Sequence, residues 1–446
     1  MAMRPLHEVF DLTDPGANVL FGTSVDEARA RVAAGDADAV GRIDGAFALV
    51  GRDGEKVRLA RSLAVPMRTF IVKRLEGPAL IVAHRIDDIR RWLQAHGHGD
   101  QFHPSYTRMV PAHHVTEIAL VGCPDPSPRH TRFLTPAPDR LPADVDAIGR
   151  AYIGRLHAAL TAWLRQIPAG APVGVLFSGG VDSGAVLVTL HQALLDLGES
   201  PGRLTAFTLS LPGPDGGPGP DLAQARDFVR RMGMDMLLQP IEADAEGLDL
   251  AGAVRVVEDY KPLDVQSAAM ALALLAGIRR RHPGLVHLAD GDGGDENLKD
   301  YPIEDNPELT IRSVLGNRLL YQEGWGVDAI KHSLTFSGGL SRAATRSFAP
   351  ARALGFRGFS PFMLPALVEV AEGIPFVALT DWSHEALYAL KGRVVAAGVR
   401  HVTGWDMPLF EKRRFQHGAG GRQAVAPRLP DAETPYRRAF AEAFEP

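Results

Sequence analysis

The residues best suited to chemistry form a glycine-rich turn, Ser178-Gly179-Gly180-Val181-Asp182-Ser183, that follows the apolar run 173–177. The two glycines lack a Cβ atom, so backbone N–H groups there can approach a phosphate closely. A helix expected directly after the turn adds its positive end, the serines add hydroxyl donors, and Asp182 adds a carboxylate for Mg²⁺. A turn that needs glycines only for its backbone is the simpler alternative, but the complete hexapeptide after a strand favours phosphate binding. A Walker loop is excluded, because its closing Gly-Lys-Ser/Thr is absent.

A second glycine-rich turn carries four acidic side chains within seven residues, namely Asp290, Asp292, Asp295 and Glu296. It follows another apolar run, residues 285–289, and therefore also lies at the end of an expected strand. Carboxylates at this spacing repel one another, so we expect a bound cation or a raised pKa. A calcium loop of the EF-hand type does not fit, because its spacing and closing glutamate are absent.

Both turns lie in a region where strands and helices alternate. The expected elements are helix 144–167, strand 173–177, helix 183–197, strand 204–209, helix 222–232 and strand 236–240. This alternation predicts an α/β domain with a parallel, doubly wound sheet, whose ligands bind beyond the carboxyl ends of the strands. Residues 212–220 are either a surface connection or a lid over the ligand. From about residue 310 onward the chain is expected to form a mostly helical extension.

The first 122 residues have a different pattern. Short alternating apolar runs are interrupted by turn residues, and two stretches have helical spacing. This predicts an α+β N-terminal domain with antiparallel sheets. Residues 123–143 are rich in proline and are expected to form a linker. The predicted domains are therefore residues 1–122 and residues 144–446.

The composition excludes several classes of protein. The 446 residues carry a formal net charge of -5, which gives no basic surface for nucleic acid. Cys123 is the only cysteine, which fits a reducing cytoplasm and excludes a four-thiolate metal site. No apolar stretch suits a signal peptide or a membrane span. We expect a cytoplasmic protein without a membrane partner, and a homodimer stays open.

With both turns considered together, the chain resembles the asparagine synthetase family, and especially its members without glutaminase activity, including the β-lactam and carbapenam synthetases. The resemblance implies that ATP is bound by Ser178, Gly179, Gly180, Asp182, Ser183, Leu209 and Gly291. It also implies Mg²⁺ on Asp182 and Asp295, and it places Asp292 near the acceptor amine, where a carboxylate accepts the proton. The family usually has Ser or Thr where this chain has Asp290, which leaves the contact to adenosine open.

Two lysines near the end extend the resemblance. Residues 390–393 and 408–420 are similar to the closing segment of the family, in which Lys412 corresponds to a lysine that stabilises charge on the acyl-adenylate. Lys391 is a second catalytic candidate in this segment. The alternative is that Lys412 belongs to a solvated basic patch with the two arginines that follow it.

The segment expected to shape the substrate pocket departs from the family. Residues 360–374 match a segment in which relatives carry Glu-x-Arg before Pro-Phe, whereas this chain has Arg357-Gly358-Phe359. The resemblance therefore implies a substrate other than plain aspartate. Tyr321 and Glu323 lie where lactam-forming relatives place a helper carboxylate, which makes Glu323 a further catalytic candidate.

The N-terminal region resembles the glutaminase domain of the family in residues 42–48, 60–66 and 110–115. That domain hydrolyses glutamine with an N-terminal cysteine, but the second residue here is Ala2, whose methyl group cannot attack an amide. We therefore expect a degenerate domain of the Ntn-hydrolase type without glutaminase activity. His113 and His114 are too few for a metal site and are expected to be packed or to lie in a surface loop.

These observations predict an ATP-dependent, AMP-forming carbon–nitrogen ligase that adenylates a small carboxylate and passes the acyl group to an amine or to ammonia. An amine in the same substrate, giving a lactam or another ring, stays open. Asp292 argues against the ring, because lactam-forming relatives carry tyrosine there, whereas the missing glutaminase argues for it. A non-catalytic nucleotide-binding adaptor is disfavoured because the expected site residues are all present. Sulfur transfer to tRNA is disfavoured because suitable cysteines are absent.

Overall fold

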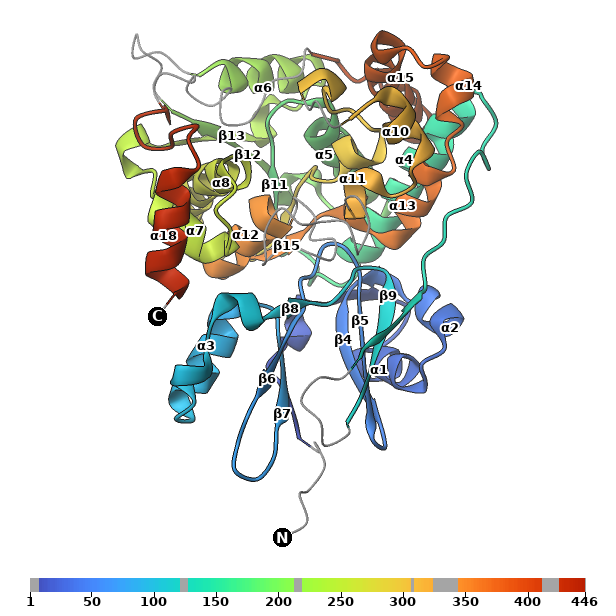
Figure 1. Cartoon of the computed structure of the whole chain (residues 1–446). Coiled ribbons are helices and arrows are strands. Elements are labelled where there is room, and N and C mark those ends of the chain that lie inside the picture. The colour runs from blue at the N-terminus through green and yellow to red at the C-terminus, as the bar shows by residue number, and fades with distance from the viewer. Residues whose placement is uncertain are drawn as a thin grey trace. The chain divides into compact units, whose positions relative to one another are not determined.

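The computed structural model describes residues 8–120, 127–211, 219–305, 309–323, 344–410 and 425–445 (Figure 1). The chain forms two compact units. The first comprises Met1–Thr135, Gln322–Ala344 and Phe440–Pro446, and the second comprises Pro136–Tyr321 and Thr345–Ala439. The first unit therefore includes two segments from late in the chain, besides the N-terminal region that the sequence pattern separates.

A five-stranded sheet with only parallel neighbours forms the centre of the second unit. Its order is β13 (Leu238–Glu242), β12 (Leu204–Ser210), β11 (Val173–Leu176), β14 (His287–Ala289) and β15 (Arg357–Phe359). The prediction of a parallel α/β sheet is confirmed. Strand β15 was not expected, since it lies in the region predicted to be helical. With three residues it is too short to show a periodic pattern, and its pairing with β14 is what makes it a strand.

Helices pack on this sheet in two groups. Helix α5 contacts β11 and packs with α4 and α15, whereas α8 contacts β12 and β13 and packs with α7 and α12. The helices described after residue 144 are α4 (Val145–Leu164), α5 (Val181–Asp196), α6 (Pro220–Arg231), α7 (Leu250–Val257), α8 (Pro262–Arg281), α9 (Gly294–Asn297), α10 (Ile311–Gly316), α11 (Leu320–Glu323), α12 (Ala349–Ala353), α13 (Pro365–Glu372), α14 (Phe376–Thr380), α15 (His384–Thr403) and α18 (Thr434–Phe444). Among the described residues, no helix combines the length and the apolar character that a membrane crossing requires.

Helix α15 lies unusually close to α4. A Cβ atom on Gly149 would lie 2.7 Å from the backbone nitrogen of Gly398, and one on Gly398 would lie 2.3 Å from the carbonyl oxygen of Gly149. Both positions therefore require glycine, because any side chain would push the two helices apart. This close packing fixes the position of α15, which carries Lys391.

In its described residues, the first unit contains two four-stranded sheets and a two-stranded sheet. The orders are β10-β9-β5-β4, β1-β7-β6-β8 and β2-β3. Their bounds are β1 (Val9–Asp11), β2 (Val19–Phe21), β3 (Asp44–Ala46), β4 (Ala48–Asp53), β5 (Lys56–Arg61), β6 (Arg68–Val72), β7 (Ala79–Ala83), β8 (Arg108–Met109), β9 (His114–Ala119) and β10 (Arg129–Arg132). The expected antiparallel pairing is confirmed, except that β1 joins β7 in parallel. Strand β10 lies inside the segment predicted to be a linker, residues 123–143, and it pairs with β9. Part of that segment therefore belongs to a sheet.

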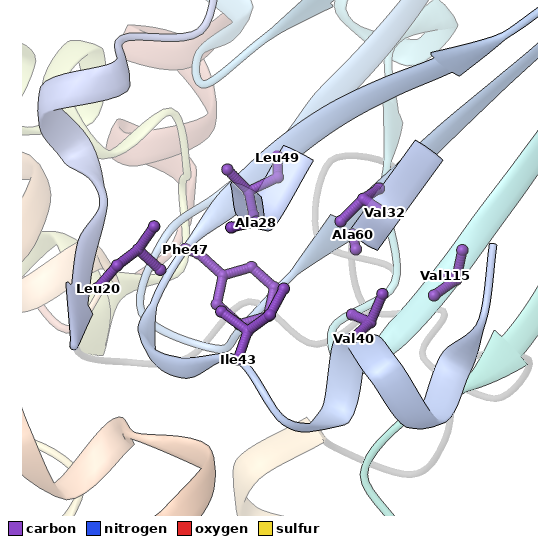
Figure 2. Packing of buried hydrophobic residues seen from close by; sticks show 9 residues of the cluster. All are labelled: Leu20, Ala28, Val32, Val40, Ile43, Phe47, Leu49, Ala60 and Val115. Carbon is purple, nitrogen blue, oxygen red and sulfur yellow. The ribbon is translucent and has the colours of Figure 1, made fainter. Parts of the chain in front are cut away.

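One apolar cluster of this unit lies between helices and the β10-β9-β5-β4 sheet (Figure 2). The unit has helices α1 (Val25–Ala34), α2 (Ala37–Gly41) and α3 (Ile86–Ala95). Helix α1 begins with a capping box between Ser24 and Glu27, which satisfies its first backbone N–H groups. Its fully buried Ala28 and Val32 belong to one apolar cluster with Phe47. Burial of this cluster accounts for the α+β layer that the apolar pattern predicts.

Candidate active site

The two predicted turns lie at the carboxyl ends of neighbouring strands. Strand β11 pairs with β14 up to Val175 and Ala289, and each strand leads directly into its glycine-rich turn. Strands β12 and β13 lie on one side of β11, and strands β14 and β15 lie on the other side. Ligands of doubly wound sheets bind at such a switch point. The sheet order therefore brings together two turns that are far apart in the sequence.

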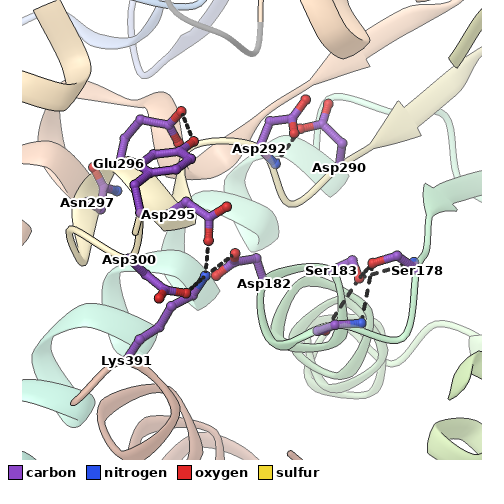
Figure 3. A network of polar contacts seen from close by, with 12 residues as sticks. Ser178, Asp182, Ser183, Asp290, Asp292, Asp295, Glu296, Asn297, Asp300 and Lys391 are labelled. Atoms are coloured by element: carbon purple, nitrogen blue, oxygen red, sulfur yellow. Dashed lines mark hydrogen bonds and ion pairs between the residues drawn. The ribbon is translucent and has the colours of Figure 1, made fainter. Parts of the chain in front are cut away.

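The turn after β11 is held by hydrogen bonds between its own residues. The Ser183 and Ser178 hydroxyl oxygens lie 3.1 Å apart, and Gly180 N–H donates to Ser178 Oγ at 3.3 Å (Figure 3). Gly179 has a φ of +75°, and a Cβ atom there would lie 2.8 Å from the backbone nitrogen of Ala225. No side chain caps α5 at Gly180, so the start of this 16-residue helix offers N–H groups to an anion.

The acidic turn after β14 packs directly against the phosphate turn. A Cβ atom on Gly291 would lie 2.6 Å from the backbone nitrogen of Ser183, and one on Gly294 would lie 2.2 Å from Asp182 Oδ1. Neither position has room for a side chain. The glycines of the acidic turn thus allow its backbone to touch the residues expected to bind nucleotide.

Lys391 of α15 connects the two turns (Figure 3). Its ammonium group donates to Asp182 Oδ2 at 2.6 Å and to Asp295 Oδ1, and it lies 3.3 Å from Asp300 Oδ2. The Lys391 side chain is 5% exposed. Burial by itself lowers the pKa of Lys391, but Asp182, Asp295 and Asp300 outweigh burial and hold it well above the ordinary value. Lys391 is therefore charged, and the two predicted metal ligands face the same point.

The two other aspartates of the turn form a second group. Asp290 accepts the Asp292 N–H at 3.0 Å and the Ser360 hydroxyl at 2.9 Å. Burial, reinforced by the neighbouring Asp292, raises the pKa of Asp290 well above its usual range. Burial also raises the pKa of Asp292 to about 6, although Arg346 and Ser347 counteract it. A carboxylate with this pKa is suited to accept a proton near neutral pH.

Some residues of the site were not found from the sequence. Asp300 contacts the ammonium of Lys391, and Asn297 donates to the Phe362 carbonyl oxygen at 2.8 Å. Glu296, which was already noted in the acidic turn, accepts the Tyr301 hydroxyl at 2.6 Å. Asp300 stands five positions after Asp295, and this spacing was the only signal for it. The partners of these side chains depend on how the segment folds after α9, which the sequence pattern does not show.

The remaining predicted residues have different surroundings. Leu209 is buried near the carboxyl end of β12, next to the strand that leads to the phosphate turn. Lys412 and Ala2 lie outside the described residues, as do most of residues 212–220.

Glu323 has its partners in the first unit. It accepts two hydrogen bonds from the Arg132 guanidinium, at 2.9 and 2.8 Å, and its Oε1 lies 2.6 Å from His113 Nδ1. Burial by itself would raise the pKa of Glu323, but these bonds outweigh burial and lower it to about 2. Both carboxylate oxygens of Glu323 are thus engaged. His113 is fully buried, in agreement with a packed histidine.

Mg²⁺ commonly binds to one or two carboxylates together with phosphates and water. Asp182 and Asp295, whose oxygens converge on one cationic group, fit this donor set. Within the described ranges, no group of three or more His, Cys, Asp or Glu side chains is arranged to hold a metal.

The family model described as asparagine synthase matches residues 156–376, a range that contains both turns and all five strands of the parallel sheet. Lys391 lies beyond the matched range. No curated protein matches the chain significantly.

Proposed function

Because the chain belongs to the asparagine synthase family, a family of ATP-dependent carbon–nitrogen ligases, we propose that it activates a small carboxylate with ATP and joins it to an amine or to ammonia. The observation that carries this proposal is the meeting of two turns at the ends of β11 and β14, with Asp182 and Asp295 directed at one point. A site that binds pyrophosphate and a cation side by side suits the cleavage of ATP to AMP and pyrophosphate.

In the first step, an oxygen of the substrate carboxylate attacks the α-phosphorus of ATP. The bond between this phosphorus and the bridging oxygen breaks, and pyrophosphate leaves with the bonding electrons. The N–H groups at the start of α5, together with Ser178 and Ser183, receive the phosphate oxygens. Mg²⁺ on Asp182 and Asp295 would neutralise charge that develops on the leaving pyrophosphate.

In the second step, the amine nitrogen attacks the acyl carbon, and AMP leaves. The attacking nitrogen must lose a proton, and Asp292, with its pKa of about 6, is the proposed acceptor. Lys391 and Lys412 are proposed to stabilise negative charge on the phosphates and on the reacting acyl group. Glu323 is not given a role in these steps, because both of its oxygens are bonded to His113 and Arg132.

The source of nitrogen is proposed to be an amine or ammonia taken from solution. Ring closure within one substrate is the alternative. Asp292 favours an external amine, because lactam-forming relatives carry tyrosine at the corresponding position.

ATP–pyrophosphate exchange with Mg²⁺ tests the proposal without knowledge of the amine. Pools of amino acids and small carboxylic acids are added, and AMP is followed by mass spectrometry. Exchange that depends on one acid, and that is lost in Asp182→Asn, would support adenylation. Wild-type protein that binds Mg-ATP with neither exchange nor AMP, even after amines are added, would favour a nucleotide-binding adaptor instead.

A further inference from the structure

The ammonium group of Lys391 contacts the same two oxygens that are assigned to the metal. It bonds to Asp182 Oδ2 at 2.6 Å and to Asp295 Oδ1 (Figure 3). A Mg²⁺ ion binds carboxylate oxygens at about 2.0–2.1 Å. An ion bound to both oxygens would lie beside the ammonium group and repel it, because both are cations in a buried site. The two cations therefore compete for these carboxylates.

The third carboxylate keeps Lys391 in this position. Asp300 Oδ2 lies 3.3 Å from the ammonium nitrogen, and α15 is fixed on α4 by the contact between Gly149 and Gly398. A metal ion that arrives alone must therefore displace a buried ammonium from its partners without offering it a new one. A metal ion that arrives with a polyphosphate brings anionic oxygens, which the displaced ammonium can bind instead.

We propose that Lys391 is an internal competitor of the divalent cation and suppresses metal binding in the absence of nucleotide. This inference rests on the metal assignment in the proposed function. Metal and nucleotide would then bind in a coupled manner, because each makes the binding of the other more favourable. The site would be kept from binding free metal ions, and it would be filled by the metal–nucleotide complex.

The test measures binding of Mn²⁺, used as the probe cation, without nucleotide by isothermal titration calorimetry. Lys391→Met should bind Mn²⁺ about tenfold tighter than wild type or better, since one buried positive charge next to the ion is removed. The double variant Lys391→Met, Asp182→Asn should lose this gain. Lys261→Met changes the net charge equally at an exposed position of the same unit and should bind as wild type does. Equal affinity in Lys391→Met and wild type would overturn the proposal, as would a gain that persists without Asp182.

Removal of Lys391 leaves three carboxylates close together, so the variant is expected to be less stable. Mn²⁺ should then raise its melting temperature more than that of wild type, because the ion replaces the lost positive charge. A destabilised variant that Mn²⁺ does not stabilise would also refute the competition. Exchange activity of wild type is measured in parallel. If wild type shows exchange but Lys391→Met gains no affinity for Mn²⁺, only the proposed competition is overturned. If Lys391→Met gains affinity for Mn²⁺ but wild type shows no exchange, only the proposed adenylation is overturned.

Discussion

Replacement of Glu323 by glutamine tests whether this carboxylate is a structural element of the first unit. Its pKa of about 2, against an ordinary 4.5, corresponds to about 3 kcal/mol of stability at neutral pH. Because the pKa is lower in the folded state, this contribution is complete above pH 4.5 and is lost as the pH falls toward 2. Glu323→Gln should therefore cost about 3 kcal/mol at pH 7 and roughly 1 kcal/mol at pH 3.

The assay must report on the first unit separately, because a chain with two units does not unfold in one step. Hydrogen exchange of peptides from β5 and β9, followed by mass spectrometry in increasing urea, gives this local free energy. Glu117→Gln is the matched control. Glu117 also bonds two cationic side chains, Lys56 and Arg58, but its side chain is 23% exposed, whereas that of Glu323 is 5% exposed.

We expect the control to lose less than about 1 kcal/mol, because Glu117 is partly exposed and water screens its bonds to Lys56 and Arg58. A loss in Glu323→Gln as small as that of the control, or one that does not shrink toward low pH, would refute the assignment. Unchanged stability together with a loss of pyrophosphate exchange would point instead to the catalytic role that the sequence suggested for Glu323.

Three further perturbations test other parts of the chain. Asp292→Asn should reduce product formation by about 10²-fold or more, while ATP–pyrophosphate exchange persists. In the wild type, the rate of product formation should fall as the pH drops below about 6, because Asp292 becomes protonated there. A rate that does not change with pH in this range would exclude Asp292 as the base. Gly294→Ala places a methyl group 2.2 Å from Asp182 Oδ1 and should weaken Mg-ATP binding measured by calorimetry, whereas Gly284→Ala, which meets open space, should not. Lys299→Met breaks a buried ion pair and should lower the unfolding free energy of the second unit by about 3 kcal/mol in urea titrations, and a loss below 1 kcal/mol would contradict this.

The sequence predicted the parts of the site that depend on neighbouring residues. The turn from Ser178 to Ser183 is recognisable because a phosphate turn needs glycines, hydroxyls and a helix start within a few positions. The same holds for the acidic turn, whose carboxylates are crowded in the sequence itself. Alternation of strands and helices then predicted a parallel sheet, because βα repeats have few other ways to bury their apolar faces.

Only the tertiary structure decided which distant residues meet. Lys391 is 209 positions from Asp182, and its contact depends on how α15 packs on α4. Glu323, from a segment late in the chain, has its partners in the first unit, which a linear pattern cannot show. Strand β15 exists because β14 offers it a pairing edge, and β10 exists because β9 does. Periodicity and spacing describe local preferences, whereas these features depend on contacts between segments that the folded chain brings together.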